Sequence, residues 1–123
     1  MKLKIQYWLM SFSLMTLNVP AVQAAEEITI PFRYAKGQVL YEMHCSSCHG
    51  QDLTGAEKGP PLLHPFYKPS HHGDAAFYKA ALKGARAHHW DFGDMQPVQG
   101  MTKKKMDSIL PYIRFYQQKK NLY

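Results

Sequence analysis

The 123-residue chain contains little cysteine and few acidic side chains. Its two cysteines can form at most one disulfide, so disulfides cannot be the main support of the fold. Only 9 acidic residues stand against 15 basic ones, which gives a formal net charge of +6 with neutral histidines. The hydrophobic content of 46% and the charged content of 20% argue against a mainly disordered chain or a collagen. This length predicts a single domain.

Long apolar runs are also missing beyond the first 24 residues. Residues 5–19 are mostly apolar, follow Lys2 and Lys4, and lead to the small residues around Ala24. This three-part pattern is typical of a secretory signal, and its apolar part is shorter than the ~20 residues that span a bilayer. No cysteine follows it directly to carry a lipid anchor.

These features predict a signal peptide over residues 1–24, cleaved near Ala24, and a mature domain over residues 25–123. We expect this domain to be periplasmic and without a stable membrane anchor, the alternative being an uncleaved anchor. A mature chain of under about 100 residues buries a limited core and often recruits a metal or a cofactor.

Three segments have helical patterns, and no run alternates convincingly as a strand. The first is expected over residues 33–44, and the second over residues 75–83, between Asp74 as N-cap and Gly84 as C-terminal stop. The third is expected over residues 103–119, behind Thr102 as N-cap. Its apolar stripe consists of Met106, Ile109, Leu110, Ile113 and Tyr116.

A proline interrupts this third pattern. Pro111 removes one backbone hydrogen bond and clashes with the preceding turn, at a cost of about 3 kcal/mol. Because Tyr112 and Ile113 continue the stripe, we expect one kinked helix rather than two. Two long loops rich in glycine, proline and histidine, residues 50–73 and 85–101, connect the helices. Loops of this length in a small domain need something to wrap around.

The pentapeptide Cys45-Ser46-Ser47-Cys48-His49 has the C-x-x-C-H spacing of c-type haem attachment. Two thiols at this spacing, at the end of a helix, can reach the two vinyl groups on one porphyrin edge and form thioethers. His49 then lies beneath the iron and supplies an imidazole ligand. The motif therefore predicts one covalently bound haem c.

Such a cysteine pair has two other common uses, a redox centre and a zinc site. A redox-active C-x-x-C would need a preceding strand and a βαβ context, which this sequence lacks. A structural zinc site needs four ligands, usually from two such pairs, and there is no second cysteine pair.

Over residues 33–118 the sequence resembles the class I cytochromes c, small soluble electron carriers with one haem. Gly37 and Tyr41 stand at the positions where that family has a glycine and an aromatic residue in its first helix. The resemblance implies that this helix crosses the last one closely, at Ile109 and Tyr112. It implies an all-α cytochrome c fold of three main helices and long loops around the haem.

The segment Gly59-Pro60-Pro61-Leu62 resembles a family loop in which the proline carbonyl accepts a hydrogen bond from the haem histidine. By that match Pro60 orients His49 and raises its basicity, and Leu62 packs on the haem. The family's second iron ligand is a methionine on the loop before the last helix. Met95 fits this position best, although Gln96 stands where the family usually has proline.

Other second ligands remain open. Met101 is the next candidate, although it is only one residue from the Thr102 cap; Met43 and Met106 belong to helices. Histidine is a further option, with five candidates in the loops: His64, His71, His72, His88 and His89. The group from His88 to Trp90, with Arg86 nearby, is an alternative site for the haem propionates.

The resemblance implies a one-electron carrier, or the small cytochrome subunit of an oxidoreductase complex, rather than an enzyme. Its partners would be a redox donor and acceptor, and the lysines at 103–105 could dock acidic surfaces on them. Nucleic acid is not expected, given the modest charge and export. Two alternatives remain: periplasmic copper or other metal handling by the His- and Met-rich loops, and a haem sensor or enzyme with an open iron site.

Overall fold

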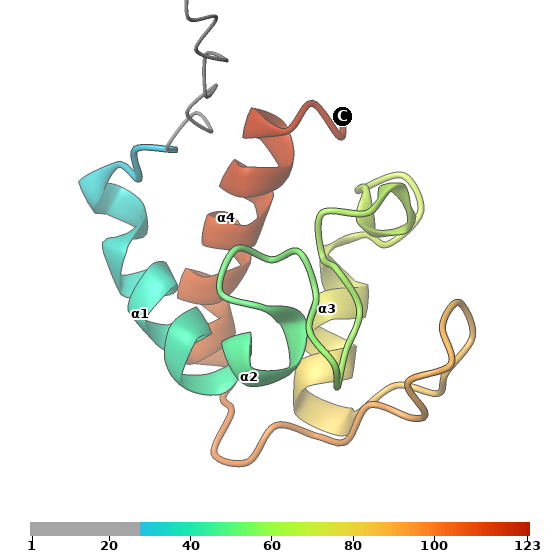
Figure 1. Ribbon diagram of the computed structural model, residues 1–123. Coiled ribbons are helices and arrows are strands. Elements are labelled where there is room, and N and C mark those ends of the chain that lie inside the picture. Colours follow the sequence, from blue (N-terminus) through green and yellow to red (C-terminus); the bar gives the residue numbers. More distant parts are fainter. Residues whose placement is uncertain (1–27) are drawn as a thin grey trace, which may run out of the picture.

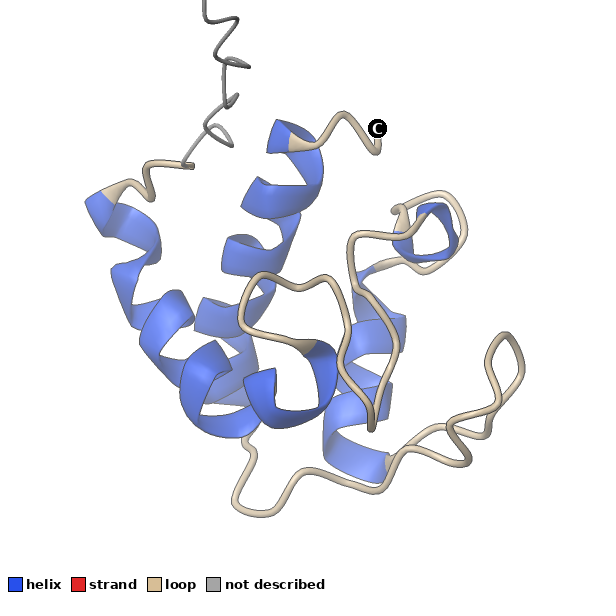
Figure 2. Ribbon diagram, in the orientation of Figure 1, coloured by secondary structure: helices blue, strands red, loops and turns tan. Residues whose placement is uncertain are grey.

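The computed structural model describes residues 28–123, so the predicted signal peptide and its cleavage site lie outside the described residues. Within this range the chain is helical, and its only β-type pairings are two isolated bridges, Ala56 with Gly59 and Ala85 with Met95. Figure 2 shows the helices joined by long loops. In chain order the elements are η1 (Phe32–Tyr34), α1 (Ala35–His44), α2 (Ser46–His49), η2 (Pro65–Tyr67), α3 (Asp74–Lys83) and α4 (Lys103–Lys119). The predicted all-α class is confirmed.

Helices α1 and α4 pack against each other near Gly37, and Figure 1 shows them side by side. A Cβ atom on Gly37 would collide with the backbone oxygen of Ser108 and approach the Cβ atom of Tyr112 to 2.9 Å. The absence of a side chain therefore sets how closely the two helices approach. Tyr41 and Tyr112, both almost fully buried, meet at this crossing with ring centroids 5.5 Å apart.

Helix α4 begins and ends as its sequence pattern predicts. The Oγ1 atom of Thr102 accepts a hydrogen bond from the backbone N–H of Lys105 at 3.2 Å, which caps the helix. The helix runs unbroken through Pro111, and Tyr112 is 1% exposed. Pro111 and Asp107, whose carbonyl loses its helical donor, both lie on the exposed side, where water can satisfy that carbonyl. The kink itself stays a prediction.

Two predicted helix starts were wrong. Helix α1 begins at Ala35, because residues 32–34 form the tighter η1 turn. Helix α3 begins at Asp74, one residue earlier than expected, so its N-cap is Gly73 and not Asp74. Instead of capping its own helix, the Asp74 carboxylate accepts a hydrogen bond from Nε of Arg114 in α4 at 3.0 Å and forms an ion pair with Nη2 of the same side chain at 2.9 Å. A long-range ion pair thus replaces the local cap that the sequence suggested.

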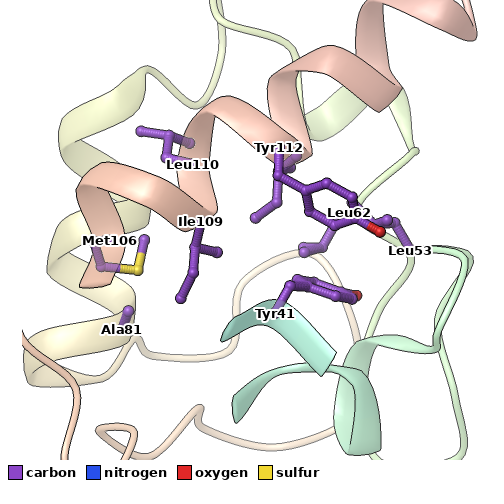
Figure 3. Packing of buried hydrophobic residues seen from close by; sticks show 9 residues of the cluster. Tyr41, Leu53, Leu62, Ala81, Met106, Ile109, Leu110 and Tyr112 are labelled. Atoms are coloured by element: carbon purple, nitrogen blue, oxygen red, sulfur yellow. The ribbon is translucent and has the colours of Figure 1, made fainter. Parts of the chain in front are cut away.

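The hydrophobic core lies between α1, α3 and α4 and includes Leu53 and Leu62 from the first long loop (Figure 3). One polar side chain, Gln117, is completely buried. Its Nε2 atom donates to the backbone oxygens of Leu62 at 2.9 Å and Tyr67 at 3.2 Å, which fastens this loop to α4. Among residues 28–123, no helix combines the length and apolar character needed to cross a membrane.

Candidate haem site

A large, mostly apolar cavity of about 1070 Å³ lies between the helices and the loop that follows α3. Ligand pockets usually measure about 300–1,000 Å³, so this one has room for a large cofactor. The predicted site residues Cys45, Cys48, His49, Pro60, Leu62 and Met95 all line it. The structure therefore brings together around one space residues that lie up to fifty positions apart in the sequence.

The two cysteines stand where α1 gives way to α2. The N–H of Cys45 still bonds to the Tyr41 carbonyl at 2.8 Å, and the N–H of His49 bonds to the Cys45 carbonyl at 2.9 Å. Both thiols are free and half-buried. Burial, followed by repulsion from Cys48, raises the pKa of Cys45 to about 11. Because an attacking redox cysteine needs a lowered pKa, Cys45 does not have the character of one.

His49 is 9% exposed and its ring is held by the loop opposite. Its Nδ1 atom lies 2.9 Å from the backbone oxygen of Pro60. A carbonyl oxygen can only accept, so Nδ1 carries the proton and Nε2 is left with its lone pair. Burial lowers the pKa of His49 despite this hydrogen bond, which favours the neutral ring that a metal needs as ligand.

The loop can approach His49 because residue 59 has no side chain. A Cβ atom on Gly59 would lie 2.7 Å from the backbone oxygen of Cys48. A bridge between Ala56 and Gly59 shapes the turn just before Pro60. Leu62, which follows, is 6% exposed and joins the core as well as the cavity wall.

Met95 is fixed by backbone pairing with the end of the preceding segment. Its N–H and carbonyl bond to those of Ala85 at 2.8 and 2.9 Å, which forms an isolated antiparallel bridge. Of the other candidate methionines, Met43 is 70% exposed, and neither it nor Met101 lines the cavity. Met106 does line it, but it is a buried core residue of α4. The geometry thus favours Met95 over Met101 as the methionine available to a cavity ligand.

The cavity wall also contains a buried indole. The Nε1 atom of Trp90 makes no hydrogen bond of ordinary geometry among the described residues, although the Tyr67 hydroxyl lies close enough to Trp90 for this contact to affect the pKa of Tyr67. Arg86, His88 and His89 line the same cavity. The indole N–H and these basic side chains together give this part of the wall donors that suit a ligand with an acceptor, such as a carboxylate.

Sequence reasoning missed one wall of the cavity. Helix α3 contributes small side chains at Ala76, Ala80 and Ala81, and the wall continues to Gly84. These residues recur at three- and four-residue spacing on one face of the helix. A stripe of small residues on a helix with marked ends is the signal that could have revealed this wall.

Comparison with protein families supplies independent information. The family model described as Cytochrome c matches residues 34–115. The search of curated proteins and the search of solved structures returned no match. Because the matched segment covers well over half of the chain, this protein belongs to the cytochrome c family. It is therefore an electron-transfer haem protein, and the family implies haem c as its cofactor.

The residues present fit such a cofactor. The cavity offers apolar walls, two free thiols at the attachment spacing, an imidazole whose Nδ1 atom is held by the Pro60 carbonyl, and a buried indole donor. These groups suit a planar macrocycle with vinyl groups on one edge and carboxylates on another.

Proposed function

We propose that this protein is a periplasmic one-electron carrier, or the small cytochrome subunit of a redox complex, with a single six-coordinate His/Met haem c. The observation that carries the proposal is that His49 and Met95, from segments far apart in the sequence, line one cavity together with the two motif thiols. The sequence contains one C-x-x-C-H motif, which supports one haem.

Each site residue has a defined role in this proposal. Cys45 and Cys48 would hold the haem, each through one thioether made by adding its S–H group across a vinyl bond. His49 provides Nε2 to the iron, while the Pro60 carbonyl keeps the proton on Nδ1 and raises the basicity of the ring. Met95 provides its thioether sulfur, and Leu62 packs against the macrocycle.

This ligand set determines the chemistry. When bound, the haem supplies a one-electron couple between ferrous and ferric iron. A methionine sulfur favours the ferrous state, so the potential exceeds that of a haem with two histidine ligands. If Met95 and His49 both held the iron, no ligand position would stay open for oxygen or substrate, as expected of a carrier rather than an enzyme.

The positive charge of the chain indicates the kind of partner it would dock with. The mature surface is basic, and acidic redox partners would associate faster at low salt. Within the lysine patch, Lys103 pairs with Asp107 at 3.1 Å, and Lys105 donates to the Gly100 carbonyl at 2.8 Å. Lys104 is exposed and has no ion-pair partner among the described residues, so it is the lysine of the patch most available for docking.

The spin state of the purified holoprotein tests this proposal. We expect a low-spin ferric spectrum with the charge-transfer band of methionine ligation, and no rapid binding of carbon monoxide to the ferrous form. Met95→Ala should abolish the band, whereas Met101→Ala should keep it. A high-spin wild type that binds carbon monoxide readily would instead support a sensor or an enzyme with an open iron.

A further inference from the structure

Four histidines from two separate loops converge at the edge of the cavity. His71 and His72 follow η2, and His88 and His89 follow α3. The Nε2 atoms of His71 and His89 are 3.1 Å apart, and those of His72 and His88 are 3.3 Å apart. Ring nitrogens of His71, His72 and His89 all lie within 4.8 Å of one another.

Backbone carbonyls determine which nitrogen of His72 and His88 carries a proton. The Nδ1 atom of His72 lies 2.6 Å from the Phe66 oxygen, and the Nδ1 atom of His88 lies 2.7 Å from the Arg86 oxygen. Because carbonyl oxygens only accept, both Nδ1 atoms are donors. In neutral rings both Nε2 atoms then have lone pairs, and the 3.3 Å contact between them has no hydrogen to share.

Two lone pairs at this distance repel unless a cation lies between them. A proton on one ring would relieve the pair, but it would place a positive charge beside three further imidazoles. A metal ion accepts lone pairs from several rings at once. A tetrahedral centre with metal–nitrogen bonds of about 2.0–2.1 Å places its nitrogens about 3.3–3.4 Å apart, close to the spacing within each pair. The three rings of His71, His72 and His89 are the ones whose nitrogens all lie within reach of a single ion, and a water or a small movement of His88 could complete the set.

The loops that carry these rings are already held in place. The His72 carbonyl accepts a hydrogen bond from Arg114 at 2.8 Å, and the Asp94 carboxylate accepts one from the N–H of Ala87 at 2.9 Å. The ring of Phe66 stacks on His89 with centroids 4.2 Å apart. Carbonyl partners on the far nitrogens, as on His72 and His88, are the usual support of histidines that bind metal.

We propose that His71, His72 and His89 form a binding site for one divalent transition-metal ion of the imidazole-preferring kind, Zn²⁺ or Cu²⁺, with His88 beside it through its contact with His72. The site would fasten the loop after η2 to the loop after α3. His72, His88 and His89 also line the large cavity, so the bound ion would lie beside the cofactor, separate from its iron ligands. The proposal rests on the proposed function in one respect, since these histidines must be free of the iron, as they are when Met95 is its second ligand.

Calorimetric titration of the untagged, chelator-treated holoprotein with Zn²⁺ tests the site. We expect one ion per chain and a loss of affinity of about tenfold or more in both His71→Ala and His89→Ala. The matched control is His44→Ala, because His44 lies outside the cluster, with Nε2 near the Lys105 ammonium at 3.2 Å. The visible spectrum of each variant checks that the haem environment is intact.

Two results would overturn the proposal. One is a wild type that binds no Zn²⁺, as expected if these rings serve only as donors to the haem carboxylates. The other is binding by His71→Ala and His89→Ala as tight as that of His44→Ala. Met95→Ala should bind Zn²⁺ like the wild type, so failure of the metal site and failure of the proposed iron ligation can be told apart.

Discussion

The Nδ1 atom of His49 lies 2.9 Å from the backbone oxygen of Pro60. This contact joins the C-x-x-C-H motif to a loop eleven residues further along, and it fixes the ring proton on the side away from the proposed iron. The Pro60 side chain is not needed for the bond. What the bond needs is that residue 59 remain glycine, so that the loop can lie against the Cys48 backbone.

Gly59→Ala should therefore disturb the haem histidine. The added Cβ atom, 2.7 Å from the Cys48 oxygen, pushes the loop away and lengthens the bond between His49 and Pro60. A less basic imidazole stabilises ferric iron less, so the reduction potential should rise, and overpacking should cost about 1–3 kcal/mol of unfolding free energy. Redox titration and urea unfolding of the holoprotein measure both effects.

Gly73→Ala is the matched control for this substitution. Gly73 has φ −62°, and a Cβ atom there would have its nearest neighbour at an ordinary 3.6 Å. The reduction potential of Gly73→Ala should equal that of the wild type. If Gly59→Ala left the potential unchanged while lowering stability, the glycine would matter for packing alone.

Gly37→Ala should destabilise the crossing of α1 and α4. A Cβ atom at this position meets the Ser108 backbone and the base of the Tyr112 side chain, neither of which can move without shifting a helix. We expect a loss of about 1–3 kcal/mol or more in unfolding free energy, with the potential little changed. Urea denaturation followed by helical circular dichroism measures it, and a fully stable variant would show that the helices separate easily.

Stability at high pH should depend on Tyr78. Its hydroxyl donates to the Asp107 carboxylate at 2.6 Å, and this bond, more than burial, raises its pKa from 10.0 to about 12. A raised folded-state pKa gives stability that is complete below pH 10 and is lost as pH rises toward 12. Tyr78→Phe should lack this part of the alkaline loss.

The same hydrogen bond shifts the pKa of its acceptor, Asp107, downward. Donation from Tyr78, and then from Lys103, lowers the pKa of Asp107 below its ordinary 3.8. Its contribution is present above that value and is lost as pH falls through the lowered pKa. Unfolding measured against pH for wild type and Tyr78→Phe separates the two arms. Parallel curves above pH 10 would contradict the assignment of the alkaline arm.

The chain should not fold without its cofactor. The cavity removes a large volume from the middle of a small domain, and its apolar lining would face water if empty. We expect Cys45→Ala combined with Cys48→Ala, produced without haem, to lack cooperative unfolding and dispersed methyl resonances. A compact apoprotein with a sharp thermal transition would contradict this.

Local patterns predicted the parts of this structure that depend on local physics. The stripe and the Thr102 cap gave α4 its bounds, because helix periodicity and capping are written within a few residues. The prediction that Asp74 caps α3 was wrong because its carboxylate bonds to Arg114, forty residues away. Helical periodicity and capping patterns cannot predict a partner so distant in the sequence.

The candidate site likewise has a part that the sequence predicts and a part that depends on the fold. The C-x-x-C-H spacing is local and identified the thiols and His49, and the family resemblance then pointed to Pro60, Leu62 and Met95. The pairing of His71 with His89 and of His72 with His88 depends on how two long loops fold around the cavity. The sequence showed only two histidine pairs, and their convergence needed the structure.

In the proposed function, Met95 is the second iron ligand and His49 the first. The most direct test is a ¹H–¹³C spectrum of the ferrous holoprotein labelled at its methionine methyl groups. One methyl resonance should be shifted far upfield by the porphyrin ring current, should vanish in Met95→Leu, and should persist in Met101→Leu. No upfield methyl in the wild type, or one that survives Met95→Leu, would contradict the account.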